Sequence, residues 1–273
     1  MHNVDDRLLK LIAVDLDGTL LTSEGKLAPR GSHLLKTAVH SGIYVLLASA
    51  RFTVSVKNFC QLLGISGPII CMNGAQVYAS PKGSVLASLS FPKEIGLEIA
   101  DLADKNGWEI SIVVGSFNHY RQRSGQAPGL LSEGRVIVAN YTDALTTNPT
   151  RILTHDPEAI EGIKACIESN YADSCHIDLT YNQDGSISSL GVFPKGADKG
   201  TALELVLRRL RINKTNVMAI GDNDNDIPMF ERAKISVAMG NAPEQVKRIA
   251  TVTAPSNDEE GVAWALSQFL LDA

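Results

Sequence analysis

The feature that most constrains the fold is an apolar run that leads directly into two carboxylates near the amino terminus. Residues 11–14 read Leu-Ile-Ala-Val, and they are followed by Asp15, Leu16, Asp17, Gly18 and Thr19. A short apolar run without alternation is typical of a strand buried on both faces, as in a parallel sheet. Asp15 is then expected at the carboxyl end of that strand, where open α/β sheets bind their ligands. Gly18 permits a sharp turn as the chain leaves the sheet.

Two carboxylates this close repel each other, so either one pKa rises or a cation lies between them. A hard divalent cation such as Mg²⁺ suits a set of oxygen ligands. With a metal and a phosphate present, an ionised aspartate can attack phosphorus and form an aspartyl-phosphate. A second, protonated aspartate can donate to the leaving oxygen. The alternative is a plain loop, in which Asp-Gly is a turn and Asp15 caps a helix.

Composition and charge limit the classes of protein to consider. The chain has 273 residues, of which 44% are hydrophobic and 20% charged, which is typical of one large or two ordinary globular domains. The net charge is −5 and no block of Lys or Arg occurs, so we expect neither a nucleic-acid nor a membrane partner. The first residues do not read as a signal peptide. Four cysteines without a Cys-x-x-Cys favour reduced, buried thiols in a cytoplasmic protein.

Strands and helices alternate in the first 84 residues and again after residue 194. Apolar runs predict strands at 43–48, 69–71, 217–220 and 235–238. Helical spacing predicts helices at 29–40, 52–63, 201–210, 228–232, 243–249 and 262–271. Thr201 and Glu204 have the spacing of a capping box that starts one of these helices. This alternation is typical of βαβ units with a parallel sheet.

Between residues 85 and 193 the sequence is more polar and mixed. Helices are expected near 95–102 and at 157–169, and a loop at 116–134. Strands are expected at 108–114, 136–138, 151–154, 175–180 and 187–193. Strands beside strands, with two helices, suggest an α+β insert. We therefore predict a discontinuous α/β core, residues 1–84 plus 194–273, interrupted by an inserted α+β domain, residues 85–193.

A second acidic cluster, residues 221–226, follows the apolar strand at 217–220. In a parallel sheet both acidic clusters lie at the same edge, which makes Asp222 and Asp226 candidate metal ligands beside Asp15. The alternative is an acidic surface loop or a calcium loop. An EF-hand is disfavoured, because no glutamate stands at its twelfth position and a strand precedes it.

A hydroxyl and a cation complete this set of groups. Ser49 ends the second strand, where its hydroxyl is placed to hold a phosphate oxygen. Lys199 lies next to the start of a helix, which attracts anions, and it adds a point charge for a phosphate. Taken alone, Ser49 could also be read as an ordinary loop serine and Lys199 as an ordinary exposed lysine, without a role in phosphate binding. Together the four places supply what phosphoryl transfer requires, which is positioning and neutralisation of developing charge.

These motifs resemble those of the haloacid dehalogenase (HAD) superfamily, and most closely its Cof-type phosphatases. The stretches that carry the resemblance are Asp15-Leu16-Asp17-Gly18-Thr19-Leu20, Ser49, Lys199, Gly221-Asp222-x-x-Asn225-Asp226, Met72-Asn73-Gly74-Ala75 and Met239-Gly240-Asn241-Ala242. They occur in the family's order along the whole chain. The resemblance implies a Rossmann-like parallel-sheet core with a large α+β cap inserted after the third strand. Such a cap closes over the site, excludes water and selects the substrate.

The resemblance also implies a role for each acidic residue. Asp15 corresponds to the nucleophile and Asp17 to the general acid/base. Mg²⁺ is implied on the carboxylate of Asp15, the backbone carbonyl of Asp17 and the carboxylate of Asp222, with Asp226 in support.

The phosphate is implied to lie against Ser49 and Lys199, with Asn225 beside it. Two residues of the phosphate-binding loop depart from the family pattern. Ser49 replaces the usual threonine and keeps the hydroxyl. Ala50 replaces the usual glycine, which is compatible only with a backbone that does not require a positive φ there.

Five further residues are candidates for contacts with the substrate. Arg51 and Asn73 lie next to the phosphate-binding motifs, although an Asn-Gly pair is also a common hairpin turn. His119, Arg121 and Arg123 lie in the polar segment of the insert and are candidates for cap contacts. For each of the three, a solvated loop residue is the favoured alternative.

The sequence therefore predicts a cytoplasmic, Mg²⁺-dependent phosphatase of small phosphorylated metabolites, acting through an aspartyl-phosphate on Asp15. Sugar phosphates are the first guess for the substrate, and they rest on the resemblance alone. A phosphomutase or phosphotransferase is the alternative within enzymes, and it would prefer an acceptor to water. Outside enzymes, the same residues are compatible with a phospho-acceptor signalling domain or a non-catalytic binding protein. A signalling domain gains nothing from an acid such as Asp17, which speeds loss of the phosphate.

Overall fold

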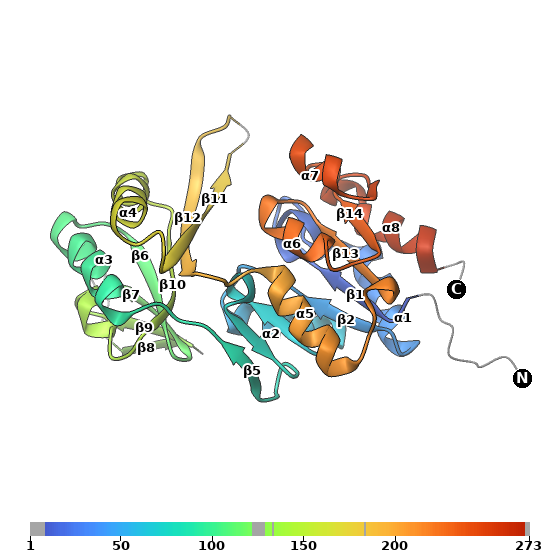
Figure 1. Cartoon of the computed structure of the whole chain (residues 1–273), viewed down its shortest axis with the longest axis horizontal. Helices are drawn as coiled ribbons and strands as arrows, with labels where there is room; N and C mark the ends of the chain where they lie inside the picture. The colour runs from blue at the N-terminus through green and yellow to red at the C-terminus, as the bar shows by residue number, and fades with distance from the viewer. Residues whose placement is uncertain (1–8, 122–128, 133, 183, 271–273) are drawn as a thin grey trace, which may run out of the picture. The chain divides into compact units, whose positions relative to one another are not determined.

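The structure of the protein is a computed structural model, and it describes residues 9–121, 129–132, 134–182 and 184–270. The chain forms two compact units. The first consists of Met1–Arg51, Ser55–Ala87 and Asp198–Ala273, and the second of Phe52–Val54 and Ser88–Ala197. Each unit has a sheet and helices of its own (Figure 1).

The first unit is built on a five-stranded parallel sheet with the order β15-β14-β13-β1-β2. Its strands are β1 (Leu11–Val14), β2 (Tyr44–Leu47), β13 (Val217–Gly221), β14 (Ile235–Ala238) and β15 (Val252–Thr253). Leu11 pairs with Tyr44 on one side and with Val217 on the other, so β1 lies between β2 and β13. Because β1 and β13 are parallel neighbours, their carboxyl ends meet at one edge of the sheet.

Helices cover both faces of this sheet. One face packs against α1 (Pro29–His40), α2 (Thr53–Leu63) and α8 (Gly261–Leu270). The opposite face packs against α5 (Lys199–Leu210), α6 (Ile227–Phe230) and α7 (Glu244–Ile249). This double cover explains the uninterrupted apolar sequence of β1, because side chains on both faces of the strand lie in a core.

A small sheet with the order β3-β4-β5 belongs to the same unit, except for Ser88 at the end of β5, which belongs to the second unit. Its strands are β3 (Ile69–Cys71), β4 (Gln76–Tyr78) and β5 (Val85–Ser88). The strand expected at 69–71 is confirmed as β3, but its main partner is β4, which is antiparallel to it. A single parallel bridge between Ala48 and Ile70 connects β3 to the end of β2.

The second unit is a seven-stranded sheet with the order β11-β12-β10-β6-β7-β9-β8. Its strands are β6 (Ile110–Val114), β7 (Phe117–Arg121), β8 (Gly129–Ser132), β9 (Arg135–Val138), β10 (Pro149–Thr154), β11 (Cys175–Tyr181) and β12 (Ile187–Pro194). The strand pairs are antiparallel except for β7 with β9. Two helices, α3 (Lys93–Asn106) and α4 (Pro157–Asn170), pack on one face and form an apolar core with it. The insert is thus α+β, as predicted.

The prediction of a loop at 116–134 is wrong, because this segment contributes the strands β7 and β8. Its polar composition favours a loop when only local sequence is considered. In the structure, β7 pairs with β6 on one side and β9 on the other, which satisfies its backbone groups. Polar residues such as Asn118 and Tyr120 are compatible with a strand whose backbone is paired on both sides.

The prediction that a capping box at Thr201 starts the helix is also wrong. Helix α5 begins at Lys199, and its N-cap is Asp198, whose carboxylate accepts a hydrogen bond from the backbone N–H of Thr201 at 2.7 Å. Aspartate is as good an N-cap as threonine. The change moves Lys199 from the preceding loop into the first turn of the helix.

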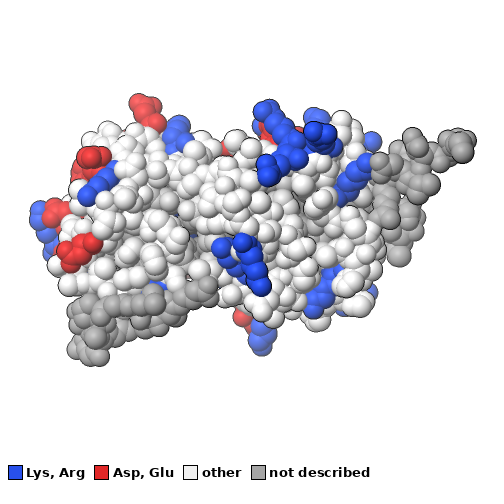
Figure 2. Space-filling view, turned by 90° about the horizontal axis from the view of Figure 1, so that it is seen from below, with Lys and Arg blue, Asp and Glu red and all other residues white. Residues whose placement is uncertain are grey.

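Charged side chains on the face drawn in Figure 2 lie in small separate groups, and the described residues of that face form no continuous basic stripe. None of the helices in the described ranges is long and apolar enough to cross a bilayer.

Candidate active site

Asp15 lies directly after β1, at the edge of the parallel sheet where β1, β2 and β13 end. Its backbone N–H donates to the carbonyl of Ile220 on β13 at 3.0 Å, and the N–H of Ala48 donates to the carbonyl of Val14 at 3.0 Å. These hydrogen bonds extend the pairing of β1 with β13 and of β2 with β1 by one residue beyond the strands. The side chain of Asp15 is buried, with 5% of the residue exposed.

Lys199 reaches this edge from the first turn of α5. Its Nζ donates to Oδ1 of Asp15 and to Oδ1 of Asp226, both at 2.6 Å. Only 1% of the lysine is exposed. A buried ammonium is stable when it is paired and hydrogen-bonded, and the two carboxylates provide this compensation. The structure thus brings the predicted lysine into direct contact with the predicted nucleophile.

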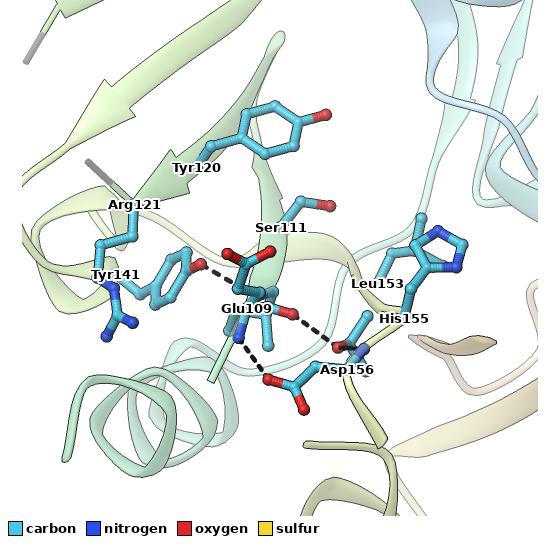
Figure 3. A pocket seen from close by; sticks show the side chains of 10 residues that line it. Glu109, Ser111, Tyr120, Arg121, Tyr141, Leu153, His155 and Asp156 are labelled. Atoms are coloured by element: carbon cyan, nitrogen blue, oxygen red, sulfur yellow. Dashed lines mark hydrogen bonds between the residues drawn. The ribbon is translucent and has the colours of Figure 1, made fainter. Parts of the chain in front are cut away.

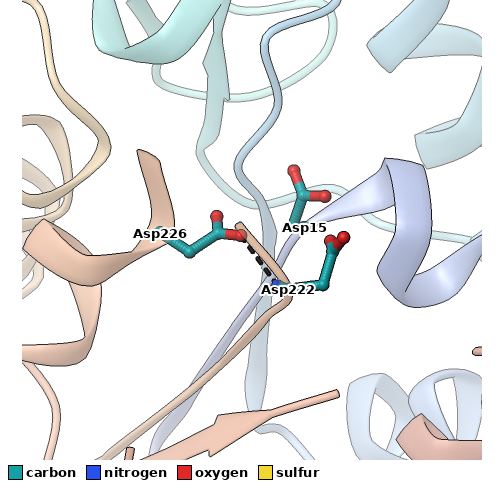
Figure 4. A group of neighbouring side chains, drawn as sticks. All are labelled: Asp15, Asp222 and Asp226. Carbon is teal, nitrogen blue, oxygen red and sulfur yellow. Dashed lines mark hydrogen bonds between the residues drawn. The ribbon is translucent and has the colours of Figure 1, made fainter. Parts of the chain in front are cut away.

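Three carboxylates converge at the ends of β1 and β13 (Figure 4). One oxygen from each of Asp15, Asp222 and Asp226 can be chosen so that all three lie within 4.8 Å of one another. The two acidic clusters therefore share one edge of the sheet. A set of carboxylate oxygens at this spacing fits a hard divalent cation such as Mg²⁺.

Asp226 differs from the other two, because both of its oxygens accept hydrogen bonds of 3.0 Å or shorter. Oδ1 accepts from Lys199, and Oδ2 accepts from the backbone N–H groups of Asp222 at 2.9 Å and Asn223 at 3.0 Å. The residue is fully buried. Asp226 therefore fixes the loop that carries Asp222, and Asp15 and Asp222 are more accessible to a metal ion.

The electrostatics of the cluster follow from this crowding. Burial raises the pKa of Asp15 well above its usual range, Lys199 opposes the rise, and the neighbouring carboxylates of Asp226 and Asp222 add to it. Burial also raises the pKa of Asp222 to about 7, with a further contribution from Asp226. Burial alone would lower the pKa of Lys199, but its attraction to Asp15 and Asp226 raises it overall. One lysine does not balance three carboxylates, so the site favours an additional cation.

Two side chains to which the sequence analysis assigns no role, those of Thr19 and Asn241, hold Asp222 in place together with Gly18. The hydroxyl of Thr19 donates to Oδ1 of Asp222 at 2.7 Å, and the amide of Asn241 donates to the carbonyl of Gly18 at 2.9 Å. Gly18 has a φ of +76°, and a Cβ built on it would lie 2.2 Å from Oδ2 of Asp222. A glycine is required here because the first acidic loop packs directly against Asp222.

Ser49 lies at the end of β2 and is fully buried. Its Oγ accepts a hydrogen bond from the backbone N–H of Arg51 at 3.1 Å, which forms a tight turn around Ala50. Ala50 has no positive φ, so the replacement of the family's glycine causes no backbone strain.

Asn73 lies in the hairpin turn that joins the antiparallel strands β3 and β4, as the Asn-Gly pair suggests, and this turn is strained. Met72 and Asn73 have φ values of +50° and +52°, and both are buried. Their backbone N–H groups donate to the carbonyls of Arg51 and Ser49, both at 3.1 Å. The side chain of Asn73 accepts from the amide of Asn225 at 3.1 Å. Strain of this kind persists where the surrounding structure holds it, commonly at functional sites.

The candidate cap contacts lie within the second unit. Arg123 lies outside the described residues. His119 Nδ1 is 3.2 Å from the carbonyl of Ile112, and burial lowers its pKa. Arg121 donates to the carbonyl of Ala103 at 3.3 Å and lies over the ring of Tyr141.

Arg121 also lines a cavity of about 500 Å³ in this unit (Figure 3). The other lining residues are Glu109, Ile110, Ser111, Tyr120, Tyr141, Leu153, Thr154, His155 and Asp156. Several of its polar groups are engaged within the unit. Tyr141 accepts from the N–H of Ile110 at 3.0 Å, and Asp156 accepts from the N–H of Glu109 at 2.9 Å.

Comparison with known proteins agrees with this arrangement. Residues 12–266 match the family model described as haloacid dehalogenase-like hydrolase. The chain is 30% identical over 287 residues to 5-amino-6-(5-phospho-D-ribitylamino)uracil phosphatase YwtE of Bacillus subtilis (strain 168), covering 96% of this chain and 98% of the relative. It is 25% identical over 283 residues to pyridoxal phosphate phosphatase YbhA of Escherichia coli (strain K12), covering 96% and 99%.

Solved structures give the same assignment. A haloacid dehalogenase-like hydrolase from Bacteroides thetaiotaomicron superposes with a TM-score of 0.81 at 25% identity, covering 95% of this chain and 99% of the other. The match extends over the parallel core and the inserted unit alike. The chain therefore belongs to the haloacid dehalogenase-like hydrolases, and within them it is a phosphoric monoester hydrolase of the Cof type.

Proposed function

We propose that the protein is a Mg²⁺-dependent phosphatase that hydrolyses small phosphorylated metabolites through an aspartyl-phosphate on Asp15. The observation that carries the proposal is the position of Asp15, which follows β1, contacts Lys199 at 2.6 Å and lies beside Asp222. A carboxylate oxygen, a fixed ammonium and a cation site would then surround the phosphoryl group of a bound substrate.

In the first step, an oxygen of Asp15 bonds to phosphorus while the bond from phosphorus to the leaving oxygen breaks. Asp17 gives its proton to that oxygen, and the alcohol leaves. In the second step, water attacks phosphorus and passes a proton to Asp17. The bond between Asp15 and phosphorus breaks, which releases inorganic phosphate and restores both carboxyl groups.

Mg²⁺ would be held by the carboxylates of Asp15 and Asp222 and by the backbone carbonyl of Asp17, with Asp226 fixing the loop. When bound, the ion neutralises negative charge on the phosphoryl oxygens. Lys199 contributes a second positive charge beside Asp15.

The phosphate would be held by the hydroxyl of Ser49 and by Lys199, with Asn225 beside them. Oδ1 of Asn225 is buried and lacks a hydrogen-bond partner among the described residues, while its amide nitrogen donates to Asn73. The amide nitrogen has two hydrogens, so one can stay on Asn73 while the other donates to a phosphate oxygen. Asn73 thus positions Asn225, and the turn at Ala50 positions Ser49.

The substrate class is a small phosphate ester, and sugar phosphates remain our first guess. The relatives named above act on a phosphorylated ribitylaminouracil and on pyridoxal phosphate, so similarity does not favour one ester. All four cysteines are free thiols, which fits a cytoplasmic location.

The first test is hydrolysis of p-nitrophenyl phosphate. We expect phosphate release with Mg²⁺ and none after removal of divalent ions with EDTA, because the acidic cluster then lacks its neutralising cation. A panel of glucose 6-phosphate, glycerol 1-phosphate, pyridoxal 5′-phosphate and nucleotides, compared by kcat/KM, identifies the preferred ester. Transfer to an added alcohol in preference to water would contradict a phosphatase. Full activity in EDTA would contradict the metal site.

The second test measures the metal without turnover. Mg²⁺ at about 100 times its Kd is expected to stabilise the fold by about 2.7 kcal/mol, seen as a higher Tm. Asp222→Asn removes a charged ligand and should abolish most of this shift. Asp224→Asn is the matched control, because Asp224 lies in the same loop but pairs with Gln245. An equal shift in all three proteins would exclude Asp222 as a ligand.

A further inference from the structure

Arg51 forms a two-point ion pair with Asp17. Nε of the guanidinium donates to Oδ2 of Asp17 at 2.7 Å, and Nη2 donates to Oδ1 at 2.5 Å. The planar fork of an arginine matches the two oxygens of a carboxylate, so this geometry fixes both the position and the plane of the Asp17 carboxyl group.

The guanidinium is itself held by α2. Its Nη1 donates to the hydroxyl of Ser55 at 3.3 Å, and its Cζ lies 5.4 Å from the centre of the Phe59 ring. Ser55 and Phe59 are four residues apart on the helix, so they present one surface to the arginine. The arginine is therefore a fixed support for Asp17 and not a freely moving surface side chain.

The backbone of Arg51 belongs to the loop that carries Ser49. Its N–H donates to Oγ of Ser49 at 3.1 Å, and its carbonyl accepts from the N–H of Met72 at 3.1 Å. One residue thus connects the hydroxyl proposed to hold the phosphate with the carboxyl group proposed to serve the leaving oxygen.

The pair has little to do with the stability of the fold. The side chains of Arg51 and Asp17 are 34% and 54% exposed, and ion pairs at such positions contribute about 0–1 kcal/mol. A precise arrangement without a large contribution to stability suggests a role in the reaction.

We propose that Arg51 is a positioning residue that holds the carboxyl group of the general acid/base Asp17 in its working place. This inference rests on the proposed function, and it differs from the sequence-based expectation that Arg51 contacts the substrate. The guanidinium directs two of its three nitrogens at Asp17 and the third at Ser55. Its action on the reaction passes through Asp17.

The test compares two esters that differ in their need for an acid. p-Nitrophenolate leaves readily without a proton, whereas the alkoxide of the best alkyl phosphate in the panel does not. We expect Arg51→Gln to lower kcat/KM by at least about tenfold for the alkyl phosphate, and by clearly less for p-nitrophenyl phosphate, since general acids contribute about 10²–10⁴-fold. Arg51→Lys, which keeps the charge but loses the fork, should recover only part of the loss.

A double-mutant cycle then identifies the partner through which Arg51 acts. In an Asp17→Ala background, Arg51→Gln should cause no further loss, because the group that it positions is already gone. The proposal would be overturned if Arg51→Gln lowered kcat/KM equally for both esters and if this loss added to that of Asp17→Ala. Arg51 would then be assigned to binding of the phosphate. No loss in Arg51→Gln would overturn the proposal as well.

Two controls separate this inference from the proposed function. Arg208→Gln removes an arginine whose side chain is 78% exposed and paired with Glu204, and it should leave both rates unchanged. Ser55→Ala weakens the support of Arg51 without touching Asp17 and should give a small loss with the same preference for the activated ester. If the wild-type protein hydrolysed no ester, the phosphatase itself would fail. If the wild-type protein hydrolysed the esters and Asp17→Ala slowed the alkyl ester most, the phosphatase proposal would stand. An Arg51→Gln variant without the expected loss would then contradict only the positioning role of Arg51.

Discussion

Asp15→Asn is expected to lower kcat for p-nitrophenyl phosphate by at least about 10⁴-fold, since removing the nucleophile of an enzyme with a covalent intermediate can cost this much or more. An amide is a poor nucleophile and a poor ligand for Mg²⁺, so the substitution removes both contributions of Asp15. The measurement is phosphate release at saturating ester and Mg²⁺, with acid-quenched protein analysed for bound phosphate. The wild-type protein should carry phosphate during turnover, and the variant should not.

The same substitution should leave the fold intact. In Asp15→Asn the ammonium of Lys199 still pairs with Asp226 at 2.6 Å, and one of three crowded carboxylates is gone. We therefore expect a Tm without Mg²⁺ that is equal to or above that of the wild type. Asp224→Asn, a carboxylate that contacts Gln245 outside the cluster, should keep full activity. Substantial turnover in Asp15→Asn would show that another group attacks the phosphorus.

Lys199→Met is expected to have the largest effect on stability. The lysine is 1% exposed and lies between Asp15 and Asp226, so its removal leaves two buried carboxylates without their partner. Breaking a buried ion pair in this way costs about 3–5 kcal/mol, which urea unfolding without Mg²⁺ will measure. Activity should also fall, because the phosphate loses a fixed positive charge.

Mg²⁺ provides the discriminating measurement for this variant. An added cation restores part of the missing positive charge at Asp15, so the loss of stability in Lys199→Met should be smaller with Mg²⁺ than without it. Lys26→Met is the matched control, because its side chain is 76% exposed and it should change stability by less than about 0.5 kcal/mol. A Lys199→Met protein as stable as the wild type would show that the cluster does not need this charge.

Much of the core could be predicted because local sequence and tertiary environment agree there. The residues of β1 are all apolar, those of β13 are apolar up to its closing glycine, and both strands are covered on both faces. In a parallel sheet this fixes where each strand ends, and therefore brings Asp15 and Asp222 to one edge. The proximity of these acids follows from that rule without knowledge of any contact.

The predictions are wrong where the backbone forms hydrogen bonds with groups that are not evident from the local sequence. The polar segment with Asn118 and Tyr120 forms β7 because β6 and β9 lie on either side of it. Helix α5 starts at Lys199 because Asp198 caps it, although Thr201 has equally good spacing with Glu204. A cap motif predicts that a helix begins nearby, and the surrounding packing determines which residue is the N-cap.

The sequence by itself determined the fold class, the family and the order of the chemical groups along the chain, because apolar periodicity and short acidic motifs are local properties. Only the tertiary structure decided which groups touch. It placed Lys199 between Asp15 and Asp226, turned both oxygens of Asp17 toward Arg51, and joined Asn73 to Asn225. These pairs are separated by 27 to 184 residues, and their geometry depends on how strands and helices pack, which no short stretch of sequence specifies.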